Sequence, residues 1–174
     1  MDVDIQLATA DDVAIIHAIM QETVANLERR EFFVDDDQGY LERHIDQAGF
    51  VLLARNGPDC LGFLMVDLPG EGENNLGRDL GWPVATLGQC AHIDSVCVRP
   101  AFRGHGLQKR LVGDAEARLE RMGIIHFLAT VHPDNIASLA SMRALGYQIG
   151  ATKPKYGGML RHILYKSPPS HDKA

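Results

Sequence analysis

Two spacings of apolar residues succeed one another along this chain, and together they predict a domain built from strands and helices. Apolar residues that alternate with polar ones, or that form short runs, indicate strands, whereas apolar residues three and four positions apart indicate helices. Helices are predicted from Thr9 through Met20 and at Gln38–Ala48, Gly106–Met122 and Pro133–Leu145. Strands are predicted at Asp4–Ala8, Phe50–Ala54, Leu61–Val66, Ala91–Val98, Ile124–Val131, Tyr147–Thr152 and Leu160–Lys166.

The order of these elements indicates the class of fold. Asn56-Gly57-Pro58-Asp59 is a turn cluster between two strand-like runs, so these two strands are expected to form a hairpin. After Cys90 the order is strand, helix, strand, helix, which requires at least one parallel crossover. We therefore expect an α/β (α+β) domain with a mixed sheet. Pro69–Gly81 lacks periodicity and is predicted to be a loop, and long loops in compact domains are often functional.

Composition narrows the class of protein. The 174 residues are 45% apolar and 23% charged, so we expect one globular domain over residues 1–166 and a flexible polar tail over 167–174. A net charge of −6 argues against a general nucleic-acid binder, and no apolar run is long enough for a membrane span. The start is acidic, unlike a secretory signal, and the three cysteines form no C-x-x-C motif. Neither a disulfide framework nor a zinc site is indicated, and we expect a cytoplasmic protein.

The most informative local signal is a glycine-containing loop that opens a helix. A predicted strand stops at Pro100, and Arg103-Gly104-His105-Gly106 then leads into the predicted helix. Glycines allow a ligand to approach the backbone closely, and the free N–H groups at a helix start suit a phosphate. The spacing is not that of a Walker loop, and a G-x-G-x-x-G fingerprint fails where Lys109 replaces the third glycine.

Two segments of the chain resemble the acetyl-CoA-binding motifs of the GNAT N-acetyltransferase superfamily. Arg103–Gln108 is similar to the pyrophosphate loop R/Q-x-x-G-x-G/A, with Gly106 on its central glycine and Gln108 where glycine or alanine is usual. His132–Tyr147 is similar to the second motif, N-x-x-[AS]-x-x-x-[YM]-x-x-x-G-[FY]. Specific sequence motifs carry the resemblance over Ala91–Tyr147. Over the rest of Asp4–Lys166, only the predicted architecture resembles that of the family.

This resemblance implies a mixed sheet of six or seven strands, flanked by about four helices, whose central parallel strands splay apart. Acetyl-CoA would be the co-substrate, with its pantetheine arm in the split, and no metal is implied. Asn135 would bond the pantetheine or a bridging backbone group, and the alternative is that Asp134 or Asn135 caps the helix that follows. The residues expected to contact the cofactor are Val96, Cys97, Val98, Arg103, Gly104, His105, Gly106, Leu107, Gln108, Asn135 and Ser138.

Acetyl transfer to an amine needs a base, because an alkyl ammonium near pKa ~10.4 is almost fully protonated at neutral pH. Many relatives have a glutamate at the position of Asp94, so Asp94 is the first candidate, directly or through water. His92 is the rival, with a hydrogen-bonded structural role as its alternative; strand alternation places both on one face with Val96 and Val98. The family's usual acid, a tyrosine, is replaced by Met142. Tyr156 or water would then protonate the thiolate.

The acceptor is expected to bind where the first helices meet. Glu31-Phe-Phe-Val-Asp-Asp-Asp37 is acidic, and acids attract a cationic amine while aromatic rings stack on it. Phe32, Phe33 and Tyr40 are candidate contacts, and Arg161 could hold a carboxylate, as in an amino acid. The implied activity is N-acetylation of a primary amine in a ternary complex by a monomer or homodimer. The alternatives are a protein N-terminal or lysine acetyltransferase and a non-catalytic acyl-CoA-binding or sensory module.

Overall fold

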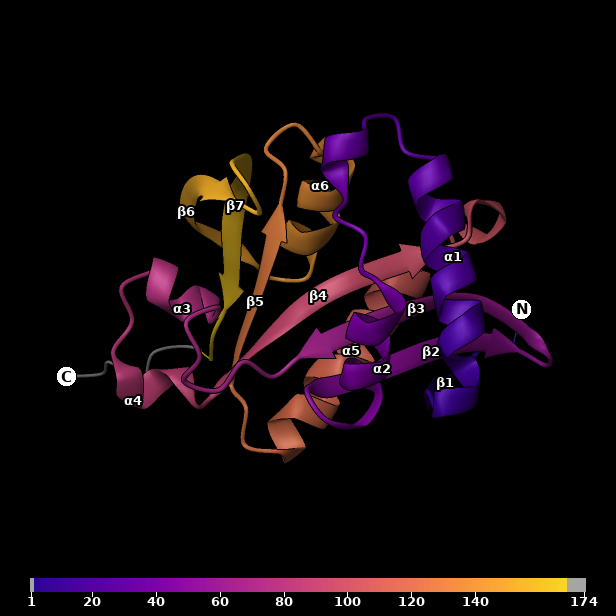
Figure 1. The fold of residues 1–174 in the computed structure, drawn as a ribbon, viewed down its shortest axis with the longest axis horizontal. Coiled ribbons are helices and arrows are strands. Elements are labelled where there is room, and N and C mark those ends of the chain that lie inside the picture. The colour runs from indigo at the N-terminus through magenta and orange to yellow at the C-terminus, as the bar shows by residue number, and fades with distance from the viewer. Residues whose placement is uncertain (1, 169–174) are drawn as a thin grey trace.

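Seven strands form one sheet, in the order β1-β2-β3-β4-β5-β7-β6 (Figure 1). The structure is a computed structural model, and it describes residues 2–168. The number and mixed character of the strands agree with the fold expected from the sequence. The strands are β1 (Asp4–Leu7), β2 (Gly49–Asn56), β3 (Asp59–Asp67), β4 (Cys90–Val98), β5 (His126–Val131), β6 (Gln148–Lys155) and β7 (Met159–Lys166).

Strands β4 and β5 are parallel and separate from each other along their length (Figure 1). Their pairing covers only three positions, from Cys90 opposite His126 to His92 opposite Leu128. Beyond these positions β4 stays paired with β3, and β5 stays paired with β7 as far as Val131. All other neighbouring strands are antiparallel. The predicted splay of the fourth and fifth strands is therefore confirmed.

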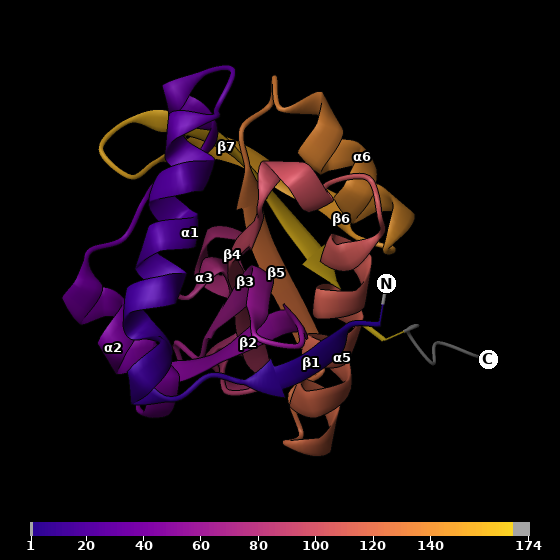
Figure 2. The same ribbon diagram turned by 90° about the vertical axis from the view of Figure 1, so that its right-hand side faces the viewer.

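Helices cover both faces of the sheet (Figure 2). On one face, α1 (Val13–Ala25) and α2 (Gln38–Asp46) pack on a core that includes Ile16 and Phe63. On the other, α5 (Leu107–Arg121) and α6 (Ile136–Ala144) pack on a core that includes Leu64 and Leu111. The segment predicted only as a loop, Pro69–Gly81, contains the short helix α3 (Leu76–Asp79), and α4 (Val84–Leu87) follows it.

A β-bulge in β4 decides which side chains reach each face. Met65 lies opposite Ser95 and Val66 opposite Ile93, so Asp94 has no partner residue on β3. One extra residue reverses the alternation of side chains beyond it. Val96 and Val98 therefore pack in the α5 core together with Ile93 rather than on the side of Asp94. The prediction that Asp94 and His92 share a face with Val96 and Val98 is wrong for the two valines.

The first helical segment and the last strand lie near the two ends of the described chain. The N–H and hydroxyl of Thr9 donate to the Asp12 carboxylate at 2.8 and 3.2 Å, and these bonds cap the start of the first helical segment. Strand β7 ends at Lys166, and the predicted flexible tail lies outside the described residues except for Ser167 and Pro168. Within residues 2–168, no helix is both long and apolar enough to cross a bilayer.

Candidate active site

The split between β4 and β5 leaves one edge of β4 unpaired. The N–H of Arg99 donates to the carbonyl of Leu61 on the β3 side at 2.9 Å. Backbone groups of successive strand residues point to opposite sides, so those of Cys97 also face β3, whereas those of Val96 and Val98 face the split. An extended chain in the split can pair with the two valines, as the sequence predicted.

Cys97 does not contribute to this edge. It lies opposite Phe63 in the β3–β4 register, and its side chain is buried in the core beneath α1. Burial raises the pKa of its thiol to about 12. The prediction that Cys97 contacts the cofactor is therefore not supported by its placement.

The start of α5 presents a group of free backbone donors. Gly104 and Gly106 have φ angles of 80° and 74°, which strongly favour glycine, and a Cβ on either would meet no atom within 4 Å. The first helical hydrogen bond runs from the N–H of Arg110 to the carbonyl of Gly106 at 3.1 Å. The N–H groups from Gly104 through Lys109 have no acceptor within the described chain. This open, donor-rich helix start fits a pyrophosphate.

Three basic side chains surround this loop. Arg103, Lys109 and Arg110 are exposed, and Arg103 Nε donates to the Val98 carbonyl at 3.1 Å. Arg110 donates to the carbonyl of Val3 at 2.6 Å, and the ring of His105 hydrogen-bonds inside the loop. These neutral partners leave the three charges in place, and together with the helix dipole they supply a positive field at this site.

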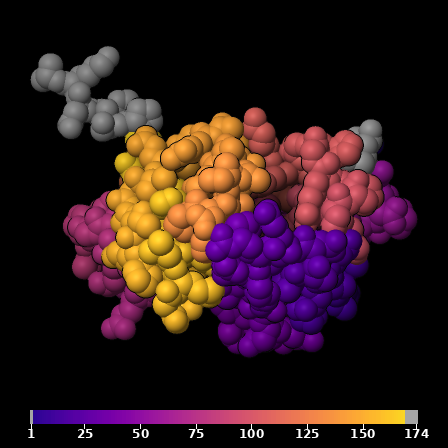
Figure 3. Space-filling view, turned by 90° about the horizontal axis from the view of Figure 1, so that it is seen from above, coloured from indigo at the N-terminus to yellow at the C-terminus, as the bar shows by residue number. Residues whose placement is uncertain are grey.

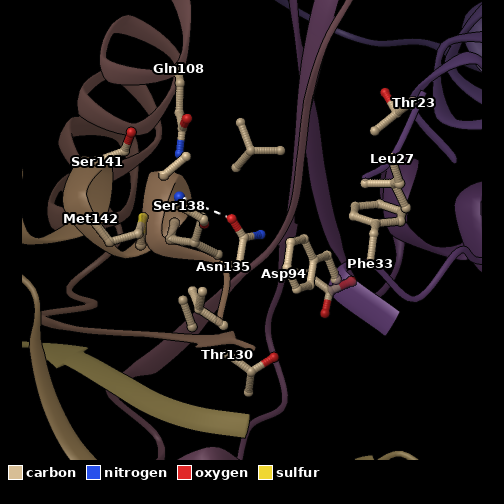
Figure 4. A pocket seen from close by; sticks show the side chains of 16 residues that line it. Thr23, Leu27, Phe33, Asp94, Gln108, Thr130, Asn135, Ser138, Ser141 and Met142 are labelled. Carbon is tan, nitrogen blue, oxygen red and sulfur yellow. Dashed lines mark hydrogen bonds between the residues drawn. The ribbon is translucent and has the colours of Figure 1, made fainter. Parts of the chain in front are cut away.

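A cavity of about 260 Å³, here called the α6 cavity, lies between α6, the start of α5, β4 and the segment before α2. Gln108, Asn135 and Ser138 line it opposite Leu27 and Phe33, and Figure 4 shows the two groups facing each other across the cavity. From above, the surface is hollowed between the segments that carry α5, α6 and the N-terminal helix (Figure 3). The α6 cavity thus continues from the start of α5 into the split.

Asn135 takes the capping role that was its alternative in the sequence. Its Oδ1 accepts the N–H of Ser138 at 3.2 Å, at the start of α6. Its Nδ2 has no acceptor within the described residues and faces the cavity, so it stays available to a ligand. Met142, at the family's tyrosine position, is 3% exposed and packs in the α5 core beside this cavity.

Asp94 stands at the junction of three cavities. With Thr130 it lines the α6 cavity, a cavity of about 380 Å³ toward α3, and one of about 240 Å³ that we call the Arg161 cavity. Its Oδ2 accepts the hydroxyl of Tyr40 at 3.1 Å. Burial, and then the negative charge of Asp67, raise the pKa of Asp94. A carboxylate with a raised pKa is a better proton acceptor near neutral pH.

Asp36 is the second acid at this junction, and among the acids of the predicted acidic segment it alone lines the Arg161 cavity. Its carboxylate accepts the Ser95 hydroxyl at 3.4 Å. Burial and the negative charge of Asp94 raise the pKa of Asp36 to about 7. The other acids are engaged elsewhere: Glu31 pairs with Arg29, Asp35 pairs with Arg30, and Asp37 caps α2. The sequence indicated an acidic segment but not which member faces the site.

His92 is held in a buried network rather than left free. Its Nε2 accepts the N–H of Leu76 at 3.0 Å, so its Nδ1 carries the proton and donates to Asp67, also at 3.0 Å. Because both ring nitrogens are engaged and the side chain is buried, His92 fits its structural alternative. It anchors the loop that precedes α3. Asp94, in contrast, faces three cavities.

Asp67 also binds His44, and this pair supports Tyr40. The two ring nitrogens of His44 face the Asp67 carboxylate at 3.0 Å and the Tyr40 carbonyl at 2.8 Å, so both must donate and the ring is cationic. Burial opposes that charge, but the two hydrogen bonds outweigh it and raise the pKa of His44. Burial likewise opposes ionisation of Asp67, yet both histidines hold its pKa near 2. The Tyr40 ring stacks on the His44 ring, with 4.1 Å between the ring centroids.

Tyr156 lies across the junction from Tyr40. It forms the β6–β7 turn with Gly157 and Gly158, and all three residues have positive φ, so the chain turns tightly there. Its hydroxyl hydrogen-bonds that of Thr130 at 3.1 Å. The residue is 48% exposed, and its partial burial raises the pKa of Tyr156 above the usual value near 10, so its hydroxyl is protonated at neutral pH as in an ordinary tyrosine. The structure thus brings Tyr156 and Asp94 to the same two cavities.

The predicted acceptor residues gather at the Arg161 cavity. Phe32, Phe33, Tyr40 and Arg161 all line it. Arg161 is 2% exposed, and its guanidinium donates to the carbonyls of Glu31 at 2.6 Å and Leu160 at 2.9 Å. Residues 2–168 hold no group of three histidine, cysteine or acidic side chains arranged to bind a metal ion.

The open edge of β4, the donor-rich start of α5 and the acids at their junction are features of an acyl-group transferase. The family model described as "Acetyltransferase (GNAT) family" matches residues 16–147, most of the chain. The chain therefore belongs to this family and is an acyltransferase. No curated protein matches it in sequence.

Solved structures agree with this fold at low sequence identity. The ribosomal-protein-S18-alanine N-acetyltransferase of Escherichia coli is 14% identical with a TM-score of 0.71, over 99% of both chains. The protein yncA of Salmonella typhimurium, solved with acetyl-CoA, is 20% identical with a TM-score of 0.73, over 100% of this chain and 98% of that one. The paia N-acetyltransferase of Thermoplasma acidophilum, solved with coenzyme A, is 14% identical with a TM-score of 0.70, over 97% and 100%.

Proposed function

We propose that this protein transfers an acetyl group from acetyl-CoA to a primary amine by direct attack in a ternary complex. The observation that carries the proposal is the continuity of three features. Free N–H groups at the start of α5 lead to the unpaired edge of β4, and that edge leads to a cavity lined by Asp94. They match, in order, the pyrophosphate, the amide-containing arm and the thioester of acetyl-CoA.

In this proposal the backbone binds most of the co-substrate. The N–H groups of Gly104 through Lys109 bind the pyrophosphate, with Arg103 nearby. The pantetheine pairs with Val96 and Val98 as an added strand, and Gln108 and Asn135 contact it from the opposite wall. Holding both substrates in place is the main contribution to the rate.

The chemical step moves one acetyl group, and the ammonium loses two protons in the course of it. The ammonium first gives one proton to Asp94, directly or through water, which frees the nitrogen lone pair. The neutral nitrogen then attacks the thioester carbon while a backbone N–H polarises its oxygen. The C–N bond forms and the C–S bond breaks. Tyr156 or water protonates the departing thiolate, and the second proton of the nitrogen passes to water. The raised pKa of Asp94 suits it to accept the first proton.

A panel of amines tests the proposal, with release of free thiol from acetyl-CoA as the readout and the mass of the product as confirmation. The panel includes amino acids, polyamines and peptides with free N-termini or lysines. We expect amine-dependent thiol release, and Asp94→Asn should lower turnover by about 10²-fold or more. The loss should shrink at high pH, where the amine deprotonates unaided. CoA binding without acetylation of any member would instead favour the acyl-CoA-binding module.

A further inference from the structure

The Arg161 cavity carries charged groups of opposite sign that the protein itself leaves unpaired. Its wall holds the guanidinium of Arg161 and the carboxylates of Asp36 and Asp94. Within residues 2–168, none of these three groups forms an ion pair. This is unusual, because charges removed from water are normally paired.

Arg161 shows the imbalance most clearly. The side chain is 98% hidden from solvent, since its relative exposure is 2%, and its partners are neutral carbonyl oxygens and the ring of Tyr156 at 5.9 Å. Two carbonyls satisfy part of its hydrogen-bonding capacity, but they do not neutralise its charge. A guanidinium presents five donors in a planar fork that matches a carboxylate. A carboxylate supplied by a ligand would complete the site.

The two carboxylates that line the same cavity have no positively charged partner among the described residues. Asp94 is held by the Tyr40 hydroxyl and Asp36 by the Ser95 hydroxyl, which are neutral donors. The two carboxylates repel each other, and a cation placed against them would remove that repulsion. The amine to be acetylated arrives as such a cation and must lie beside Asp94 for the transfer.

We propose that the acceptor is a small zwitterion, an amino acid whose carboxylate binds Arg161 while its amine binds at Asp94 and Asp36. This inference rests on the proposed acetyl transfer and specifies its substrate class. Both charged walls belong to one cavity of about 240 Å³, so the amine and the carboxylate must be close together in the ligand. A peptide N-terminus lacks a carboxylate at this position, and a polyamine has none.

The test compares each amino acid with its α-amide, which keeps the amine and side chain but replaces the carboxylate with a neutral group. Rates are measured at saturating acetyl-CoA, together with a peptide and a polyamine. We expect kcat/KM for the amino acid to exceed that for its amide by about 10²-fold or more, because the amide leaves the buried guanidinium without a counter-charge. Arg161→Gln should abolish this preference by lowering kcat/KM for the amino acid alone.

A matched control separates recognition from support of the fold. Arg161 also holds the Glu31 carbonyl, and Arg29 binds the Glu31 carboxylate at 2.6 Å without lining the cavity. Arg29→Gln loosens the same segment and should affect the amino acid and its amide equally. Should Arg161→Gln fail to fold, two comparisons of kcat/KM between an amino acid and its amide still distinguish recognition from support of the fold. One is made in the wild type and the other in Arg161→Lys.

Two results in the comparison of amino acids with their amides would overturn the inference. One is equal use of amino acids and amides by the wild type. The other is an equal loss of kcat/KM for the amino acid and its amide in Arg161→Gln, which would mean that Arg161 only supports the Glu31 segment. Acetylation of peptides or polyamines in preference to amino acids would leave the proposed acetyl transfer intact and reject the zwitterion. Absence of transfer to any amine would reject both.

Discussion

Replacing Gly106 by alanine should separate the binding of CoA from the stability of the fold. Gly106 has a φ of 74° and lies at the N-cap of α5. A Cβ there meets no protein atom within 4 Å, so alanine should not clash with the fold, and on the proposed site we expect it to crowd a pyrophosphate held by the neighbouring N–H groups. The left-handed conformation costs a non-glycine residue about 1–2 kcal/mol. In a protein of this size, that cost lowers the melting temperature by roughly 2–8 °C.

The effect on CoA should be larger than this strain. Loss of two charge-assisted hydrogen bonds from the loop, at about 1.5 kcal/mol each, weakens binding by about 10²-fold. CoA at about 100 times its wild-type Kd stabilises the wild type by about 2.7 kcal/mol, or roughly 5–11 °C. At the same concentration, the variant should gain only about 0.4 kcal/mol, or roughly 1 °C.

Gly123→Ala is the matched control for the assay, which is thermal unfolding with and without CoA. Gly123 follows the other end of α5, has a φ of 82°, and a Cβ there also meets no atom within 4 Å. It should show a similar fall in melting temperature and a full CoA-induced rise. The same rise in Gly106→Ala as in the wild type would refute the assignment of this loop to the pyrophosphate.

Three further predictions concern protons and charges in the site. In the proposed mechanism Asp94 acts only when it is ionised, so kcat should rise with pH through the raised pKa of Asp94. Asp36→Asn removes a neighbouring negative charge and should move this rise in kcat to lower pH. An unchanged pH profile in Asp36→Asn would show that the charge of Asp36 does not affect the ionisation of Asp94. The pKa of Asp67 is near 2 in the fold and 3.8 unfolded, so its interactions with His44 and His92 contribute about 2 kcal/mol above pH 4 that is lost as the pH falls through 2. Urea unfolding at both pH values should show this loss in the wild type and lack it in Asp67→Asn. Tyr156→Phe should lower kcat with less effect on the KM for acetyl-CoA, and unchanged turnover would assign protonation of the thiolate to water.

The sheet and the glycine loop before α5 could be predicted because their signals are local. The apolar spacing after Leu107 predicts α5, and the two glycines before it have the positive φ that favours this residue. Likewise, the adjacent glycines after Tyr156 favour the tight turn that the structure shows before the last strand. In each case, neighbouring residues determine the backbone without help from distant parts of the chain.

The features that the sequence analysis missed depend on contacts between distant segments. The bulge at Asp94 arises from the register with β3, and no pattern within β4 marks it. As a result, strand alternation misplaced Val96 and Val98. Asp36 resembles its acidic neighbours in sequence, and only the packing of the segment before α2 against β4 brings it near Asp94. The hydrogen-bond partners of His92, which are Asp67 and the N–H of Leu76, are likewise set by the fold.

The central claim is that acetyl-CoA lies in the split between β4 and β5 with its thioester at Asp94. A crystal structure of the protein with CoA tests this claim most directly. We expect the pyrophosphate on the N–H groups of Gly104 through Lys109, the pantetheine paired with Val96 and Val98, and the sulfur in the cavity that Asp94 lines. CoA bound elsewhere, or a sulfur directed away from Asp94, would contradict the account.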